Sequence, residues 1–496
     1  MKTTLISPTD LDLSKFELSD LQEDVFEDLE LKPILETMSD KDKFLNNTIL
    51  KTWFTPLKTN EELLYRQAAV KDAVTHPQEI HDLYQVVIDT IKTVRSEFWS
   101  LDSGSASYKL HSFSRQIDIY LNYIAKLKEF SNTDWQSKNF QEFFTRLTQI
   151  FPPDALNTMH ALIDNIVTNS TYSYPVKLNK NFGSDISDLD FNKKAGRFSG
   201  MMGSVMTRFD KKEANFMIPE RDDDSSNALG HYNNVADLSL ATKVVNTKYE
   251  LEKFFNELQF QVGFLLGSVR LKNSLPNINI SYPTVNSKTA ITGLKNVVLL
   301  ISEDSPSMVV GNDLEGPNMS LVIISGTNQG GKTTTLRSIG QAQLMMDAGM
   351  YVFADNYQAP LYDQICTHFK REEDSRLTSG KLDNELSRMS NIVKNIKSKS
   401  LVLMNESFSS TNEHEGSQIN AQVVSGLVNS GTTVISVTHQ FEFSKMLSLN
   451  DDIEPIFLRP ERDQNGHRSF KLLKGTPLKT SFGIDIYDRV FGTNTK

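Results

Sequence analysis

The chain contains the segment Ser325-Gly326-Thr327-Asn328-Gln329-Gly330-Gly331-Lys332-Thr333, which has the pattern G-x-x-x-x-G-K-[ST] from Gly326 onward. The residues before it, Ser320 to Ile324, form a short apolar and β-branched run, which predicts a buried parallel strand. The residues after it, Thr334 to Met346, are rich in helix formers and place apolar side chains at helical spacing. A strand, a glycine-rich loop and a helix in this order predict a phosphate-binding site.

The residue types of this loop suit a nucleoside triphosphate. Glycines allow the backbone N–H groups to point at phosphate oxygens, and the N-terminus of the following helix adds partial positive charge. We expect Lys332 to reach the β- and γ-phosphates and Thr333 to offer its hydroxyl to Mg²⁺. The predicted nucleotide contacts in this segment are Gly326, Thr327, Asn328, Gln329, Gly330, Gly331, Lys332, Thr333 and Thr334.

Length and composition are those of an ordinary globular protein. With 496 residues, 39% hydrophobic and 23% charged, the chain has room for two or more domains. The net charge of −10 does not point to nucleic acid, although a local basic patch can lie within an acidic total. The single cysteine, Cys366, excludes an internal disulfide and a cysteine-cluster zinc site and suits a cytoplasmic location. The longest apolar run, Val297 to Ile301, is too short to span a membrane, so we expect no membrane association.

Three segments follow one another along the chain. Residues 1–40 are acidic but carry regularly spaced apolar residues, which predicts an amphipathic helical arm. Residues 41–275 have a mainly helical periodicity, with an irregular, clamp-like insert near 173–234. The helical patterns are 44–54, 61–74, 80–98, 113–130, 140–151, 155–168 and 238–271.

From residue 276 to 496 the pattern changes. Short β-branched runs alternate with helices, which predicts an α/β domain with a mostly parallel sheet. The predicted strands are 297–301, 321–324, 401–404 and 433–437.

The second half of the nucleotide site follows the strand Ser400 to Met404. Such strands ordinarily end in Asp-Glu, in which the first carboxylate holds Mg²⁺ through water and the second polarises the attacking water. Here the pair is Asn405-Glu406. We therefore predict Glu406 as the general base and Asn405 as a weakened metal site with slow hydrolysis, although a tolerated substitution without functional meaning is an equal alternative.

A further strand, Thr433 to Val437, ends in Thr438-His439. A histidine at this position reaches the γ-phosphate in ABC-type ATPases, so His439 joins Lys332 and Glu406 as a candidate catalytic residue. The polar turn Ser407 to Gly416 lies between the two strands, where such ATPases place a loop that crosses the dimer interface. The order of these pieces predicts an ABC-class ATPase rather than a kinase or GTPase.

These motifs resemble the MutS family of DNA mismatch-repair ATPases over residues 41–490. The phosphate loop is similar to its Pro-Asn-Met-Gly-Gly-Lys-Ser/Thr loop, and Leu401 to Glu406 is similar to its Leu-Val-Leu-Met-Asp-Glu strand. The remaining similar segments are Val309-Val310-Gly311-Asn312-Asp313-Leu314, Thr438-His439, Ser481-Phe482-Gly483-Ile484, and Trp53-Phe54-Thr55-Pro56-Leu57 with Arg66 and Val70. The resemblance implies ATP and Mg²⁺ as cofactors, Val310 and Asn312 beside the adenine, and a homodimer formed through the ATPase domains.

The chain also departs from that family. The lever-like segment begins by about residue 41, so we expect no mismatch-reading domain, no connector domain and no Phe-x-Glu wedge, and we expect no nuclease domain after the ATPase. The family's Ser-Gly-Arg-Ser-Thr motif, which acts across the dimer, is reduced to Ser379-Gly380-Lys381-Leu382-Asp383. Ser379 and Gly380 remain candidates for contact with the nucleotide of the partner subunit.

Two functions of different classes fit the sequence. The first is an ATP-driven clamp on double-stranded or branched DNA, with Lys193, Lys194 and Arg197 of the insert as phosphate contacts. A solvated loop with locally balanced charge is the alternative for these residues. The second is an ATP-gated protein-interaction switch with slow hydrolysis and no DNA role, which the acidic net charge and Asn405 favour.

Overall fold

The computed structural model describes residues 3–9, 12, 14–97, 106–168, 223–303, 305–316, 319–326, 330–371, 380–450, 452–462 and 468–477. By internal packing the chain forms two compact units. The first, here called the helical unit, comprises Met1–Thr4 and His81–Val262. The second, here called the sheet unit, comprises Leu5–Ile80 and Gly263–Lys496. The first 80 residues therefore pack almost entirely with the C-terminal half, a different division from the segments 1–40, 41–275 and 276–496.

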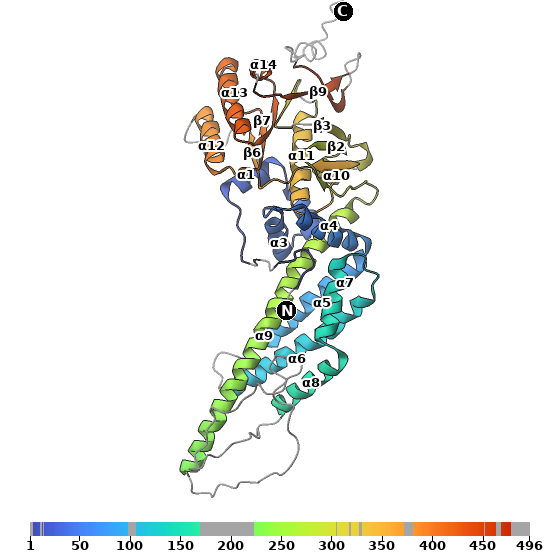
Figure 1. The fold of residues 1–496 in the computed structure, drawn as a ribbon, viewed down its shortest axis with the longest axis vertical. Helices are drawn as coiled ribbons and strands as arrows, with labels where there is room; N and C mark the ends of the chain where they lie inside the picture. Colours follow the sequence, from blue (N-terminus) through green and yellow to red (C-terminus); the bar gives the residue numbers. More distant parts are fainter. Residues whose placement is uncertain are drawn as a thin grey trace, which may run out of the picture. The chain divides into compact units, whose positions relative to one another are not determined.

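The helical unit is built from long helices (Figure 1). They are α5 (Pro77–Ser96), α6 (Ala106–Glu129), α7 (Lys138–Ile150), α8 (Pro153–Thr168) and most of α9 (Asp223–Ser274), with a short 3-10 helix η2 (Phe130–Asn132). In α7 the buried residues Phe140, Phe143, Phe144 and Leu147 repeat at helical spacing and line one face. The helical periodicity read from the sequence is confirmed.

An aromatic cluster fills the core of the helical unit. Trp135 stacks on Phe140 with ring centroids 4.1 Å apart, and Phe143 stacks on Phe254 of α9 at 6.3 Å. Tyr120 of α6 stacks on Phe255 at 5.1 Å. Large flat side chains of this kind bury much apolar area for each residue. The cluster therefore joins α6, α7 and α9.

The larger sheet of the sheet unit has six strands in the order β10-β9-β4-β8-β7-β6. The strands are β4 (Leu321–Ser325), β6 (Gln364–Phe369), β7 (Ser400–Asn405), β8 (Thr433–Thr438), β9 (Ile456–Arg462) and β10 (Arg468–Lys474). All neighbours are parallel except β10 and β9. The residues of β4 are all buried, as expected for a strand with both faces covered. A mostly parallel sheet is confirmed.

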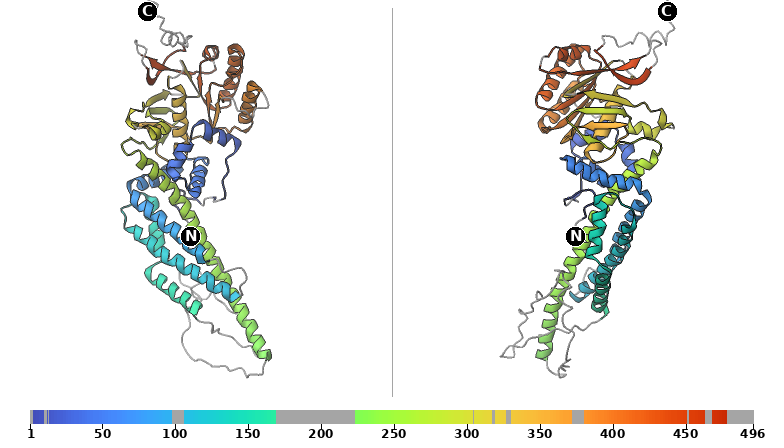
Figure 2. Two further views of the ribbon diagram at one scale, coloured as in Figure 1. Left: turned by 180° about the vertical axis from the view of Figure 1, so that it is seen from behind. Right: turned by 45° about the vertical axis from the view of Figure 1, so that its right-hand side comes forward.

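Helices on the faces of this sheet bury its apolar residues. They are α11 (Lys332–Asp347), α12 (Lys381–Asn395), α13 (Glu413–Asn429) and α14 (Phe441–Ser448). Figure 2 shows α11 lying along the sheet, where it contacts β7 and β8. The core combines residues of β4, β6, β7 and β8 with Met389 and Ile392 of α12. This is the layered arrangement of an α/β domain.

A smaller four-stranded sheet has the order β1-β5-β2-β3, from β1 (Thr284–Val285), β2 (Thr289–Leu294), β3 (Asn312–Gly316) and β5 (Asn356–Ala359). The short helices α10 (Val297–Ser302) and η3 (Pro306–Met308) connect β2 to β3. The strand predicted at 297–301 is therefore wrong. The side chain of Asn296 accepts a hydrogen bond from the Leu299 backbone N–H at 3.0 Å and caps a helix, of which only Val297 and Leu300 are buried.

The N-terminal segment belongs to the sheet unit and forms α1 (Asp20–Asp28), α2 (Lys32–Ser39), α3 (Lys43–Trp53) and α4 (Asn60–Thr75). A capping box between Ser19 and Gln22 begins α1, which carries Asp20 and Glu23 in its first turn. Helix α1 contacts the edge strand β6, and its Leu21 belongs to the same hydrophobic core as β4 and β7 (Figure 1). The acidic N-terminal arm is therefore helical.

No helix in the described part of the chain is long and apolar enough to cross a membrane. Several predicted site residues lie outside the described residues: Thr327, Asn328, Gln329, Ser379, Lys193, Lys194 and Arg197, together with 169–222 of the clamp-like region and the segment Ser481–Ile484.

Candidate functional site

The ends of three strands place the predicted site residues together. In the parallel register, Ser325 at the end of β4 pairs with Thr438 of β8, and Asn405 at the end of β7 pairs with Val437. The phosphate loop, the Asn405-Glu406 pair and His439 follow directly after these ends. Carboxyl ends of parallel strands meet at one edge of a sheet, which is where α/β proteins bind ligands.

Two glycines shape the phosphate loop. Gly326 has φ +132° and Gly331 has φ +82°, both in the region that favours glycine. A Cβ atom at Gly326 would also lie 2.9 Å from the Cδ of Pro460 in β9. Gly331 is the N-cap of α11, so the loop leads straight into the positive end of that helix. The backbone geometry suits an anion at this helix N-terminus.

Lys332, the first residue of α11, is buried with its side chain 4% exposed. Its Nζ donates to the backbone oxygen of Gly326 and lies 3.7 Å from Oε1 of Glu406. Burial lowers the pKa of Lys332, and the charge of Glu406 opposes that shift. A buried ammonium held by a carbonyl and one carboxylate is well placed to bind a phosphate group.

Thr333 and Asn405 are directly bonded across the site. The hydroxyl of Thr333 donates to Oδ1 of Asn405 at 3.0 Å. Both side chains present oxygen atoms, which Mg²⁺ prefers, but neither carries a charge. Within the described residues no group of three His, Cys, Asp or Glu side chains could hold a metal. As neutral oxygen ligands, Thr333 and Asn405 fit a Mg²⁺ ion that takes most of its ligands from phosphate oxygens and water.

Glu406 and His439 form an ion pair through Oε2 and Nδ1. Burial acts to raise the pKa of Glu406, but the hydrogen bond and charge of His439 and the charge of Lys332 outweigh it, so the pKa is lowered. The bond to Glu406 in turn raises the pKa of His439. Glu406 is therefore ionised at neutral pH, as a general base must be.

The turn that carries Glu406 has an uncommon backbone. Glu406 has φ +53° and Phe408 has φ +55°, a region that costs non-glycine residues about 1–2 kcal/mol each. Burial of the Phe408 side chain and a hydrogen bond from Gln440 Nε2 to the Phe408 oxygen at 3.3 Å hold the turn. Such conformations cluster at functional sites.

Other predicted residues have different surroundings. The Asn312 amide donates to the Phe470 backbone oxygen at 3.1 Å and accepts from the Leu472 N–H at 2.8 Å, so it joins β3 to β10. Val310 is half-buried just before β3, and Gly380 is the exposed N-cap of α12. The Thr334 carbonyl accepts hydrogen bonds from Asn296 and Ser338.

Sequence reasoning missed Phe470, which lies beside the phosphate loop. A Cβ atom at Gly331 would lie 3.6 Å from Cδ1 of the Phe470 ring, and Phe470 is 49% exposed. Its φ is +59°, and it lies in the part of β10 where the register with β9 shifts. A bulge in a late edge strand has no local sequence pattern that would have revealed it.

A glycine-rich phosphate loop, an Asn-Glu pair and a histidine at the ends of adjacent parallel strands define a P-loop ATPase domain of the ABC type. Two family descriptions match the chain: residues 58–278 match the MutS2 N-terminal domain, and residues 322–492 match MutS domain V. The chain belongs to the MutS family.

Curated relatives match over parts of the chain. "Endonuclease MutS2" of Alkaliphilus oremlandii is 28% identical over 168 residues, which is 34% of this chain and 21% of that protein. "Endonuclease MutS2" of Geobacillus sp. is 25% identical over 230 residues, 45% of this chain and 28% of that protein. "MutS protein homolog 4" of Homo sapiens is 27% identical over 191 residues, 37% of this chain and 20% of that protein. The matches thus span less than a third of each relative's length.

Proposed function

We propose that this protein is an ATP-dependent DNA-binding protein of the MutS type, a homodimeric clamp that acts on double-stranded or branched DNA structures rather than on mispaired bases. The observation that carries the ATPase part is the convergence of Lys332, the Thr333–Asn405 pair and the Glu406–His439 pair at one edge of the sheet. Membership of the MutS family supports the DNA part.

The proposed reaction is attack of water on the γ-phosphorus of ATP, which breaks its bond to the bridging oxygen and releases ADP and phosphate. Glu406 accepts the proton of the attacking water, a role that requires the ionised carboxylate that its lowered pKa maintains at neutral pH. Lys332 and His439 stabilise negative charge on the phosphate oxygens. Mg²⁺, held beside Thr333 and Asn405, supplies charge neutralisation when bound.

Asn405 accounts for slow hydrolysis in this proposal. Its amide oxygen accepts the Thr333 hydroxyl, as a carboxylate would, but it adds no negative charge to retain Mg²⁺. The site then favours binding of ATP over rapid turnover, which suits a clamp that stays closed while ATP is bound.

Phe470 is the proposed platform for the adenine ring. It is the exposed aromatic side chain beside Gly331, and aromatic faces stack well on bases. Asn312 acts indirectly in this arrangement, because its amide fixes the backbone of Phe470 and Leu472. Ser379 and Gly380 remain the proposed contacts to the nucleotide of the partner subunit.

An ATP-gated protein-interaction switch with no DNA role is the second candidate. The net charge of −10 favours it, because an acidic surface repels the phosphate backbone. Under this reading ATP binding changes the affinity for a protein partner, and slow hydrolysis resets it.

The test is steady-state ATP hydrolysis by the purified protein at low salt, alone and with homoduplex, mismatched, branched and single-stranded DNA. Stimulation by one DNA class, lost when Lys193, Lys194 and Arg197 are changed to Ala, supports the clamp. ATP binding with a flat response across the panel and no DNA binding at low salt supports the switch.

A further inference from the structure

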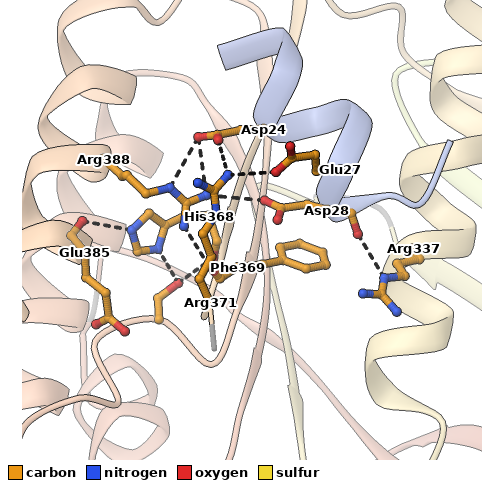
Figure 3. A network of polar contacts seen from close by, with 10 residues as sticks. Asp24, Glu27, Asp28, Arg337, His368, Phe369, Arg371, Glu385 and Arg388 are labelled. Carbon is orange, nitrogen blue, oxygen red and sulfur yellow. Dashed lines mark hydrogen bonds and ion pairs between the residues drawn. The ribbon is translucent and has the colours of Figure 1, made fainter. Parts of the chain in front are cut away.

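Helix α1 and helix α12 share a largely buried set of ion pairs in the sheet unit (Figure 3). Asp24 of α1 accepts from Nε and Nη2 of Arg388 in α12, both at 3.3 Å, and also pairs with Arg371. Asp28 Oδ2 lies 3.4 Å from the same Nη2. The side chains of Asp24, Asp28 and Arg388 are 18%, 8% and 12% exposed, so these contacts are shielded from solvent. The two carboxylates fix α12 through one guanidinium.

Arg388 also reaches the end of strand β6. Its Nη1 donates to the backbone oxygen of Phe369 at 2.8 Å. Phe369 directly follows His368, which is fully buried. The guanidinium of Arg388 in α12 therefore contacts both α1 and the last residue of β6, and so connects the three elements.

His368 connects α12 to the turn that carries Glu406, and Figure 3 shows its contact with Glu385. Its Nε2 lies 2.9 Å from the carbonyl oxygen of Glu385 in α12, and its Nδ1 lies 2.8 Å from Oγ of Ser407. A carbonyl only accepts, so Nε2 carries the hydrogen. Burial lowers the pKa of His368 to about 4, so the ring is neutral and Nδ1 is an acceptor. The single Ser407 hydroxyl hydrogen lies between two acceptors of His368, this Nδ1 and the backbone oxygen, which is 2.9 Å from Oγ.

Ser407 is the middle residue of the turn with positive φ at Glu406 and Phe408. The Phe408 ring packs on His368 with centroids 5.3 Å apart. A second contact joins the same elements, because the Ser410 hydroxyl donates to Glu385 Oε1 at 2.9 Å. The uncommon backbone of Glu406 thus depends on partners from β6 and α12.

We propose that α1 is an intramolecular brace for the hydrolysis step. Asp24 fixes the position of Arg388 and α12, and His368 links α12 to Ser407. Ser407 in turn holds its neighbour Glu406 in place. The effect on hydrolysis rests on the proposed ATPase function. Asp24, Arg388, His368 and Ser407 are positioning residues here, because none of them is among the residues proposed to contact ATP.

The matched pair of variants is Asp24→Asn and Glu23→Gln. Both remove one negative charge from neighbouring positions of α1 and keep the side-chain volume. Glu23 is exposed, whereas Asp24 carries the ion pairs to Arg371 and Arg388. If only the net charge of α1 matters, hydrogen exchange and ATP hydrolysis change alike in the two variants. If α1 acts as a brace, they change only in Asp24→Asn.

The first measurement is hydrogen exchange of the Glu406 amide, which donates to the Val437 carbonyl at 2.9 Å. In Asp24→Asn this exchange is expected to become about tenfold faster, and in Glu23→Gln to change by less than about twofold, because weakening the brace makes opening of the turn easier. Equal exchange in both variants overturns the proposal. This readout needs no ATP and is independent of the proposed function.

The second measurement is single-turnover ATP hydrolysis alongside ATP affinity. Asp24→Asn is expected to lower the rate about tenfold and leave affinity within about threefold, because only the base is displaced. Ser407→Ala acts on the same chain of contacts. The double variant with Asp24→Asn and Ser407→Ala is therefore expected to hydrolyse ATP little more slowly than either single variant. Additive effects overturn the brace. An inactive wild-type protein whose Glu406 exchange still responds to Asp24→Asn contradicts the ATPase function and leaves the brace standing.

Discussion

The Thr333 hydroxyl at the start of α11 donates a 3.0 Å hydrogen bond to the Asn405 side-chain oxygen at the end of β7. This bond joins the phosphate loop to the strand that precedes Glu406, the proposed general base, and it is made by an amide where such strands ordinarily end in aspartate. The two side chains proposed to hold Mg²⁺ are therefore in contact, but neither supplies a negative charge.

Asn405→Asp is expected to raise Mg²⁺-dependent ATP turnover by about tenfold. The carboxylate keeps the acceptor for Thr333 and adds a negative charge beside the ion, which strengthens its binding. Turnover measured across a Mg²⁺ titration checks this, with Asn405→Ala as the variant that removes the acceptor. An unchanged Mg²⁺ dependence in Asn405→Asp would mean that the amide is merely tolerated.

Lys332→Ala is expected to weaken ATP binding by about 100-fold. The substitution removes the buried ammonium and with it the proposed charge-assisted contact with phosphate, which is worth about 1.5–3 kcal/mol. Binding of a fluorescent ATP analogue measures the change. Lys445→Ala, on the exposed side of α14, serves as the control, and equal affinities in the two variants would disprove the assigned site.

Glu406→Gln is expected to bind ATP normally and to slow hydrolysis by a factor of about 10²–10⁴, because the amide cannot accept the proton. ATP should then hold the protein in a dimer, seen as a larger species by light scattering. The exposed Glu454→Gln is the control. Undiminished hydrolysis in Glu406→Gln would exclude this residue as the base.

The Glu406–His439 pair predicts a pH-dependent contribution to stability. The lowered pKa of Glu406 stabilises the fold above its ordinary value of 4.5, and this is lost as pH falls through the lowered pKa. The raised pKa of His439 stabilises the fold below its ordinary value of 6.5, and this is lost as pH rises through the raised pKa. The contribution is therefore complete between pH 4.5 and 6.5.

His439→Gln should consequently reduce the free energy of unfolding more at about pH 5.5 than at about pH 9. Urea unfolding at both pH values measures the difference. His414→Gln, at an exposed pair with Glu442, should have a small effect at either pH. A loss for His439→Gln that is the same at both pH values would show that the pair is not formed.

Arg66→Leu is expected to reduce the free energy of unfolding by about 3 kcal/mol. The buried Arg66 donates to the Ile6 oxygen at 3.0 Å and to the oxygen of Ala348, the C-cap of α11, at 3.2 Å. Burial lowers its pKa to about 10, so it stays charged, and the leucine would leave both carbonyls without this donor. Urea unfolding compares it with Lys71→Leu on the exposed side of α4, and similar losses would contradict the prediction.

The sequence by itself determined the class of protein. The phosphate loop, the Asn-Glu pair and the Thr-His pair are short, contiguous patterns, and each lies at the end of a strand that its own β-branched run predicts. The helical periodicities of residues 44–168 and 238–271 are likewise local, because one amphipathic face encodes a helix. These signals were sufficient for the family, the ATPase fold and the order of the elements.

Only the tertiary structure decided which distant groups meet. The Asn312 amide completes the backbone pairing of β10, a role fixed by partners about 160 positions away in the chain. The apolar run at 297–301 became a helix because Asn296 caps it and its surroundings bury only one side. The acidic arm docks on β6 and α12 because Asp24 and Asp28 find a buried guanidinium there. Such pairings depend on where the folded backbone places each charge, and no local pattern encodes that.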